Sequence, residues 1–247
     1  MNLLIDIGNS HFKWSFTGVE DMPREVHYQP VDALTAGFLD TVWQDDGPPE
    51  RVLIANVRGD MPAAVITNWC QSTWNIRPLF VQVTREFDGL VCGYEDISQL
   101  GVDRWLALIA AWMRKRQACC VVDCGTAVTI DAIDNSGRHL GGLILPGVGM
   151  MQDMLCSHTH GIDAQGKTGV HKLFATGTRD AVASGTILAV SCSINHARSG
   201  LQALTGELPP GLLTGGGSAG IRPYLEGDYE YVETLVLEGL QHMALTI

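Results

Sequence analysis

Residues 119–131 read CCVVDCGTAVTID, a pattern that predicts two strands joined by a tight turn. The apolar run before Asp123 is typical of a strand covered on both faces, and the alternation after the turn favours a half-exposed partner strand. Gly125 has no Cβ, so a phosphate could approach the backbone there, beside the hydroxyl and amide of Thr126. A carboxylate repels phosphate oxygens, so we interpret Asp123 at the strand end as the ligand of a bound cation.

The N-terminal residues show the same strand–turn–strand pattern. Residues 3–14 read LLIDIGNSHFKW, again an apolar run, an Asp-x-Gly turn, two polar residues and a second strand. A single turn of this kind is a weak signal, because such turns occur in any β-hairpin. Two copies, each between strands and each near the start of a possible domain, favour a shared function. Two unrelated hairpin turns are the alternative.

The order of the expected elements also repeats along the chain. A strand–strand–strand–helix order appears twice, which predicts a duplicated α/β fold with two mixed sheets, flanking helices and an active-site cleft between the halves. The predicted domains are 1–116 and 117–247. The residues between 20 and 50 are acidic and turn-rich, with a loop at 45–49. The other elements are expected as hairpins at 1–18, 119–133 and 138–145, strands at 51–57, 78–83 and 229–232, and helices at 62–74, 105–113, 178–200 and 218–226, followed by a terminal helix.

Composition restricts the class of protein. Of the 247 residues, 46% are hydrophobic and 17% are charged, which excludes a disordered chain or a coiled coil. The net charge of −11 argues against binding to nucleic acid or to an anionic membrane surface. Seven cysteines favour a reducing compartment, and the lack of a Cys-x-x-Cys pair argues against a structural zinc site. No apolar run reaches membrane-spanning length, so we expect a cytoplasmic protein.

The helix expected at 105–113 is apolar nearly all round. Such a helix must be buried on several sides, and one of those sides could be a subunit interface.

A polar cluster surrounds the start of that helix. Asp103 directly precedes the apolar run, so its simplest role is a helix N-cap. Arg104 follows it, and Tyr94 lies nine residues earlier in an irregular segment. A base, a cation and a phenol together could hold a small alcohol that carries a carboxylate, and could remove its hydroxyl proton.

Two further motifs have simpler readings. Residues 161–168, GIDAQGKT, satisfy the pattern of a P-loop, but no strand precedes them and no convincing helix follows. We therefore interpret them as a polar loop and predict that Lys167 lies outside the nucleotide site. Nearby Cys156, His158 and His160 could bind a metal, although a solvated loop is the preferred reading.

Three glycines at 215–217 follow an apolar strand and precede a helix. They form either a flexible loop or a backbone surface against which an adenosine could lie.

Together these motifs resemble the type III pantothenate kinases of bacteria, members of the superfamily of acetate and sugar kinases, actin and heat-shock ATPases. The resemblance extends over almost the whole chain and is weakest at 156–171, and Ser10 stands where the family often has threonine. The matching motifs are Asp6-x-Gly8-Asn9-Ser10, Tyr94 with Gly101-x-Asp103-Arg104, Asp123-x-Gly125-Thr126-Ala127, Gly141-Gly142-x-Ile144-x-Pro146-Gly147, and Thr178 with Ala181 and Gly185.

The resemblance implies a duplicated ribonuclease-H-like fold, a homodimer, and transfer of the ATP γ-phosphate to pantothenate, the first step of coenzyme A synthesis. It also implies a need for Mg²⁺ and for a monovalent cation, K⁺ or NH₄⁺. Asp103 would be the general base and Asp123 the ligand of the monovalent cation. ATP would be bound by Asp6, Ile7, Gly8, Asn9, Ser10, His11, Phe12, Lys13 and Thr126, and pantothenate by Tyr94, Gly101, Val102, Asp103, Arg104 and Thr178.

Two other functions are compatible with the same motifs. Another small-molecule kinase of the superfamily would keep both Asp-x-Gly turns and differ around Tyr94 and Asp103. A nucleotide-dependent regulatory module without enzymatic activity would bind ATP and signal through domain closure.

Overall fold

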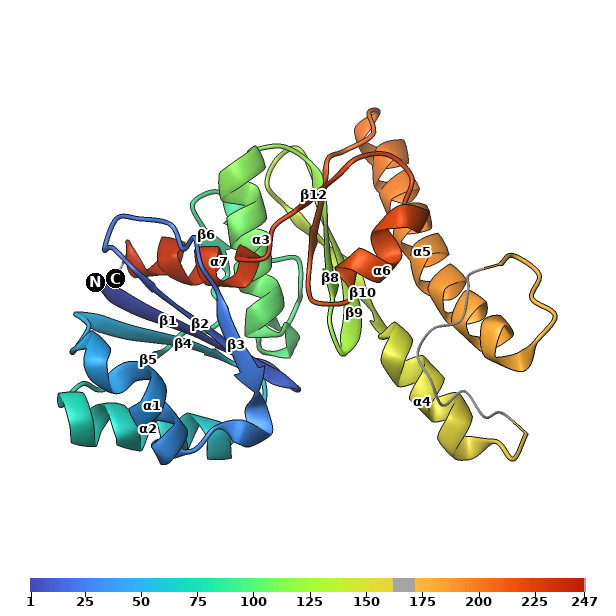
Figure 1. Cartoon of the computed structure of the whole chain (residues 1–247). Coiled ribbons are helices and arrows are strands. Elements are labelled where there is room, and N and C mark those ends of the chain that lie inside the picture. Colours follow the sequence, from blue (N-terminus) through green and yellow to red (C-terminus); the bar gives the residue numbers. More distant parts are fainter. Residues whose placement is uncertain (162–171, 247) are drawn as a thin grey trace. The chain divides into compact units, whose positions relative to one another are not determined.

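The computed structural model describes residues 1–161 and 172–246. The chain forms two compact units, unit 1 with residues 1–114 and 233–247 and unit 2 with residues 115–232 (Figure 1). The predicted domain boundary after residue 116 lies close to residue 114, where the first segment of unit 1 ends. The last residues, however, were assigned to the second half and pack in unit 1 instead. The reason is helix α7 (Leu235–Ala244), which buries its apolar side chains against β1 (Asn2–Ile7).

Unit 1 contains a five-stranded sheet in the order β3-β2-β1-β4-β5. Its central strand, β1, is buried along its whole length, as the apolar run predicts. It pairs antiparallel with β2 and parallel with β4. The other strands of this sheet are β2 (His11–Thr17), β3 (His27–Pro30), β4 (Arg51–Asn56) and β5 (Leu79–Phe80).

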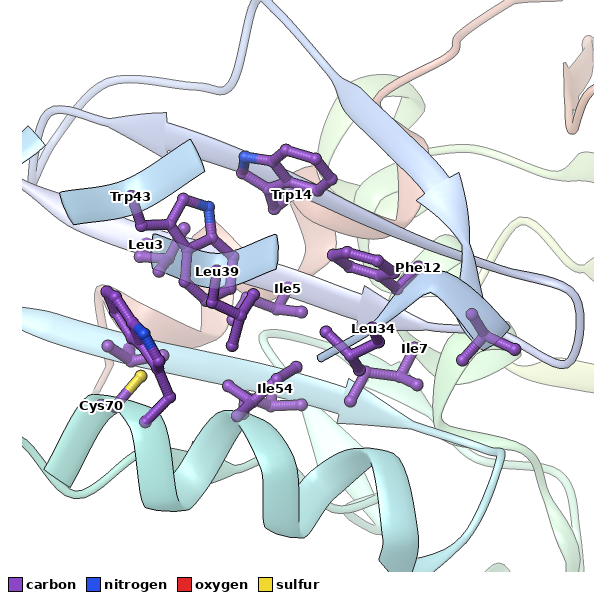
Figure 2. Packing of buried hydrophobic residues seen from close by; sticks show 14 residues of the cluster. Leu3, Ile5, Ile7, Phe12, Trp14, Leu34, Leu39, Trp43, Ile54 and Cys70 are labelled. Atoms are coloured by element: carbon purple, nitrogen blue, oxygen red, sulfur yellow. The ribbon is translucent and has the colours of Figure 1, made fainter. Parts of the chain in front are cut away.

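Helices α1 (Ala36–Trp43) and α2 (Asp60–Trp74) share a hydrophobic core with this sheet. Figure 2 shows side chains of β1, such as Leu3 and Ile5, packed with Leu39 and Trp43. Neither β3 nor α1 was predicted, because the residues between 20 and 50 are acidic and turn-rich. Leu39 and Trp43 lie one helical turn apart and are fully buried, so burial of one apolar face stabilises α1.

Helix α3 (Val102–Lys115) begins three residues before its predicted start, and its residues 104–112 are all buried within the single chain. Its apolar surface therefore gives no support to a subunit interface. A short hairpin of β6 (Glu86–Phe87) and β7 (Leu90–Val91) lies nearby and turns through Asp88 and Gly89, both with positive φ. The indole nitrogen of Trp112 donates to the Asp88 carbonyl at 3.0 Å and ties this hairpin to α3.

Unit 2 repeats the topology of unit 1. Its five-stranded sheet has the order β10-β9-β8-β11-β12, with the central strand β8 antiparallel to β9 and parallel to β11. The repeated order confirms the duplicated α/β fold that the sequence predicts. The strands are β8 (Cys119–Cys124), β9 (Ala127–Ile133), β10 (His139–Pro146), β11 (Gly211–Thr214) and β12 (Tyr229–Tyr231), and the helices are α4 (Val148–His158), α5 (Thr178–Thr205) and α6 (Ser218–Ile221).

Val190 and Ile194 on α5 are fully buried and share a core with the apolar residues of β8 and β9. Within the described residues, no helix combines the length and the apolar character needed to cross a membrane.

Candidate active site

Both Asp-x-Gly turns leave the central strand of their sheet. Asp6 is the penultimate residue of β1, and Asp123 is the penultimate residue of β8. The amide of Gly8 donates to the His11 carbonyl at 3.0 Å, and the amide of Gly125 donates to the Ala127 carbonyl at 3.0 Å. Each turn thus lies at the carboxyl end of a strand with a parallel neighbour, which is where α/β sheets bind ligands.

The first turn exposes only part of the predicted ATP-binding segment. Asn9, Ser10 and His11 are exposed. Ile7 and Phe12 are fully buried in the core, so their side chains are directed away from any ligand in solvent. Any contact that these two residues make with a nucleotide would involve their backbone.

Lys13 is half-buried on β2, directly opposite Asp6 in the antiparallel ladder. Of the predicted segment 6–13, the turn and this lysine are therefore the parts that suit a nucleotide phosphate.

Two glycine loops pack against the second turn. The amide of Gly147 donates to the Thr126 carbonyl at 2.9 Å, and the amide of Gly217 donates to the Cys124 carbonyl at 2.8 Å. A Cβ at Gly147 would overlap the carbonyls of residues 125 and 126, and one at Gly215 would overlap the Asp123 carboxylate. The glycine segment 215–217 therefore makes close contacts with this turn, which a freely flexible loop would not make.

Two residues of the predicted polar cluster at the start of α3, Arg104 and Tyr94, are in contact. Arg104 Nη1 donates to the hydroxyl of Tyr94 at 3.0 Å, and its guanidinium carbon lies 5.6 Å from the centre of the Tyr94 ring. Arg104 is buried despite its charge. A buried guanidinium requires hydrogen-bonding partners, so this arginine holds a defined position.

Asp103 is not the residue that precedes the helix. Because α3 begins at Val102, Asp103 is the second helical residue and lies in the first turn. The carboxylate of Asp103 accepts a hydrogen bond from the amide of Arg104 at 2.8 Å. This corrects the N-cap interpretation and leaves Asp103 half-buried, in contact with the backbone of Arg104.

Arg85 is a residue of this cluster that the sequence analysis missed. Its Nη1 donates to the carbonyl of Tyr94 at 2.6 Å, and its Nη2 donates to the carbonyl of Glu95 at 2.9 Å. The guanidinium thereby holds the backbone that carries the phenol. The turn signal Asp88-Gly89 could have located the hairpin beside it, but no local pattern distinguishes this arginine from other surface arginines.

The remaining predicted residues lie in unit 2. Thr126 is exposed in the second turn, and Thr178 is the exposed first residue of α5. Thr178 lines a cavity of about 840 Å³ between α4 and α5, together with apolar side chains that include Met150, Met154 and Leu155.

The P-loop-like motif lies largely in residues 162–171, outside the described part of the chain, so the assignment of Lys167 stays a prediction. Cys156, His158 and His160 are described. Among the described residues, no group of three or more His, Cys, Asp or Glu side chains is placed to hold a metal ion.

Solved structures of other proteins share the fold of this chain. A conserved Campylobacter jejuni protein assigned to the Baf transcriptional activator family has a TM-score of 0.62 and 23% identity, covering 97% of this chain and 95% of that one. A Sinorhizobium meliloti protein assigned as a 2-dehydro-3-deoxygalactonokinase has a TM-score of 0.58 and 16% identity, covering 100% and 97%. The chain therefore has the duplicated fold of the sugar kinases and actin-like ATPases.

The family follows from the sequence comparisons. The model of the type III pantothenate kinase family matches residues 2–199. Type III pantothenate kinases of Nitrosococcus oceani and Thiobacillus denitrificans are 36% and 38% identical, over 99% and 98% of this chain and 94% and 96% of theirs. The chain belongs to the type III pantothenate kinase family, and it is a kinase.

Proposed function

We propose that this protein transfers the γ-phosphoryl group of ATP to the hydroxyl of pantothenate, giving 4′-phosphopantothenate for coenzyme A synthesis. The family match over residues 2–199 carries the proposal. The contact between Arg104 and Tyr94 beside Asp103 supports it, because this cluster has the donors and the base that a hydroxy acid requires.

ATP is assigned to the first turn, with Asp6, Gly8 to Lys13 and the backbone near Ile7, and to Thr126 in the second turn. Phosphoryl transfer depends mainly on positioning and on neutralising charge on the transferred group. Asp6 offers carboxylate oxygens at a strand end, which are suitable ligands for Mg²⁺. Bound Mg²⁺ would supply the positive charge that a chain of net charge −11 lacks.

Pantothenate is assigned to Tyr94, Gly101, Val102, Asp103, Arg104 and Thr178. Arg104 and the Tyr94 hydroxyl would bind the substrate carboxylate, since a guanidinium donates several hydrogen bonds from one plane. Asp103 would accept the proton of the attacking hydroxyl.

Asp123 is assigned to a monovalent cation, K⁺ or NH₄⁺. Its carboxylate lies against the backbone of Gly215 and of the turn that contains Gly125. A cation held there would bridge the carboxylate and the phosphate oxygens, which otherwise repel each other.

A second copy of the chain is assigned to an apolar surface of unit 2, because α3 is buried within the single chain. Leu143 and Ile144 are exposed on the edge strand β10, and Met150 and Met154 are exposed on α4. An exposed edge strand beside exposed apolar side chains favours association, and a symmetric homodimer is the commonest outcome.

The direct test is a substrate screen with purified protein, ATP and Mg²⁺. We expect ADP release to depend on pantothenate and mass spectrometry to detect one added phosphoryl group on pantothenate. Glucose and N-acetylmannosamine serve as comparison substrates. ATP consumption with one of these sugars and not with pantothenate would replace the proposal by another kinase activity, and ATP binding without turnover would favour a regulatory module.

A further inference from the structure

Arg58 lies beside the first Asp-x-Gly turn although it is distant in sequence. Strands β1 and β4 are parallel, so their carboxyl ends meet at one edge of the sheet. Just beyond that edge, the amide of Val57 donates to the Ile7 carbonyl at 3.1 Å. Arg58 Nη1 donates to the carbonyl of Asn9, in the middle of the turn. The guanidinium therefore lies at the backbone to which we assign the ATP phosphates.

The segment that carries Arg58 is held by the side chain of Asn56. Asn56 Oδ1 accepts from the amide of Arg58 at 3.0 Å, and Asn56 Nδ2 donates to the Gly59 carbonyl at 2.9 Å. Helix α2 begins at the next residue, Asp60. An Asx turn of this kind fixes the backbone between strand and helix, and it fixes the root of the Arg58 side chain.

The known contacts of Arg58 leave most of its hydrogen-bonding capacity for a ligand. A guanidinium has five N–H donors. Besides the Asn9 carbonyl, its side chain has one described charged neighbour, Asp32, at 3.6 Å from Nη2. The Asp32 side chain is 91% exposed and that of Arg58 39%, so this pair is screened by water and is weak.

We propose that Arg58 is a further nucleotide-binding residue, which donates hydrogen bonds to phosphate oxygens of ATP at the first turn. The proposal rests on the assignment of ATP as the phosphoryl donor. A planar guanidinium is suited to bidentate binding of phosphate. It would add a positive charge from outside the segment 6–13, in a chain whose net charge of −11 repels a polyanion.

Steady-state kinetics with three variants test the role. Arg58→Gln removes the charge, Arg58→Lys keeps the charge without the planar group, and Asp32→Asn removes the other neighbour of Arg58. We expect Arg58→Gln to raise the KM for ATP about tenfold while the KM for pantothenate changes less than about twofold. Arg58→Lys should lie between Arg58→Gln and the wild type. Asp32→Asn should leave the KM for ATP unchanged or lower it.

A binding measurement separates phosphate contact from support of the turn. ATP and adenosine are titrated into wild type and Arg58→Gln, because adenosine lacks the phosphates. Weaker ATP binding with unchanged adenosine binding supports the proposal. Equal weakening of both ligands, or an unchanged KM for ATP, would overturn it, as would equal effects of Arg58→Gln and Asp32→Asn. If the wild type binds ATP but does not phosphorylate pantothenate, the proposed function fails while these titrations still decide the role of Arg58.

Discussion

Asp6 and Asp123 occupy equivalent positions in two sheets of the same topology. Each is the fifth of six residues in a central strand. Each faces a parallel neighbour across the ladder, Asp6 opposite Ala55 and Asp123 opposite Thr214. Their surroundings differ, because Asp6 is buried and Asp123 is only half-buried beside the glycine loops. We therefore propose that the two carboxylates bind different cations, Mg²⁺ at Asp6 and a monovalent cation at Asp123.

Replacement of potassium by sodium should lower the activity sharply if Asp123 acts through a monovalent cation. If the carboxylate faced phosphate oxygens directly, the electrostatic repulsion energy would be roughly a few kcal/mol at the effective dielectric of a partly buried site. Rates are measured in matched potassium, ammonium and sodium salts for wild type and Asp123→Ala. The variant should have a low rate that no longer depends on the cation. Equal wild-type rates in potassium and sodium would remove the cation assignment.

Asp103→Asn should separate catalysis from stability. Asp103 is not the N-cap of α3, and asparagine can still accept a hydrogen bond from the amide of Arg104. The melting temperature and the affinity for ATP should therefore stay close to wild type. Loss of the general base should lower kcat by roughly a hundredfold or more. Normal turnover in the variant would show that another group accepts the proton.

Arg85→Ala should weaken the binding of pantothenate without removing the base. The substitution deletes the hydrogen bonds to the carbonyls of Tyr94 and Glu95, so the phenol loses its fixed position. We expect the KM for pantothenate to rise several-fold, with a smaller change in kcat and little change in the KM for ATP. Arg77→Ala, at another exposed arginine of unit 1, is the matched control. An unchanged KM for pantothenate would mean that Tyr94 needs no such support.

Ile144→Glu should dissociate the proposed dimer. Ile144 is 65% exposed on the edge strand β10, and a charge there would have to be desolvated in an interface. Sedimentation velocity should show a wild-type dimer at low micromolar concentration and a monomer for the variant. Met61→Glu, at an 81% exposed methionine on α2, should stay dimeric. A stable and active wild-type monomer would contradict the homodimer.

Thiol labelling should distinguish exposed from buried cysteines. Burial raises the pKa of four thiols to about 12, namely Cys70, Cys119, Cys120 and Cys124. Only the thiolate reacts with a disulfide reagent, so at pH 8 these four stay protonated and unreactive while the protein is folded. Cys92 is also buried, whereas Cys156 is partly exposed and Cys192 is exposed.

We therefore expect Cys156 and Cys192 to react promptly and the others only after denaturation. The measurement is the absorbance released by a disulfide reagent before and after addition of guanidinium. Cys192→Ser should reduce the prompt reaction by one thiol. Prompt reaction of Cys119 or Cys120 would show that the β8 strand opens readily.

The sequence alone determined the central strand of each sheet and both turns of the candidate site. Apolar runs that end in Asp-x-Gly identify β1 and β8, because strand burial and turn geometry depend on neighbouring residues. Helix α1 was missed because its acidic surroundings concealed a short apolar face. The sequence also predicted the cluster of Tyr94, Asp103 and Arg104, because these residues lie within ten positions of one another.

Only the tertiary structure determined which distant residues join these motifs. Parallel pairing of β1 with β4 brings Arg58 to Asn9, 49 residues away in sequence. Likewise, the buried Gln241 on α7 donates to the carbonyl of Gly18, which places the end of the chain in unit 1. Such contacts depend on strand pairing and packing across long sequence separations. The local sequence identifies an arginine or a glutamine as a hydrogen-bond donor. The fold determines which carbonyl accepts its hydrogen bond.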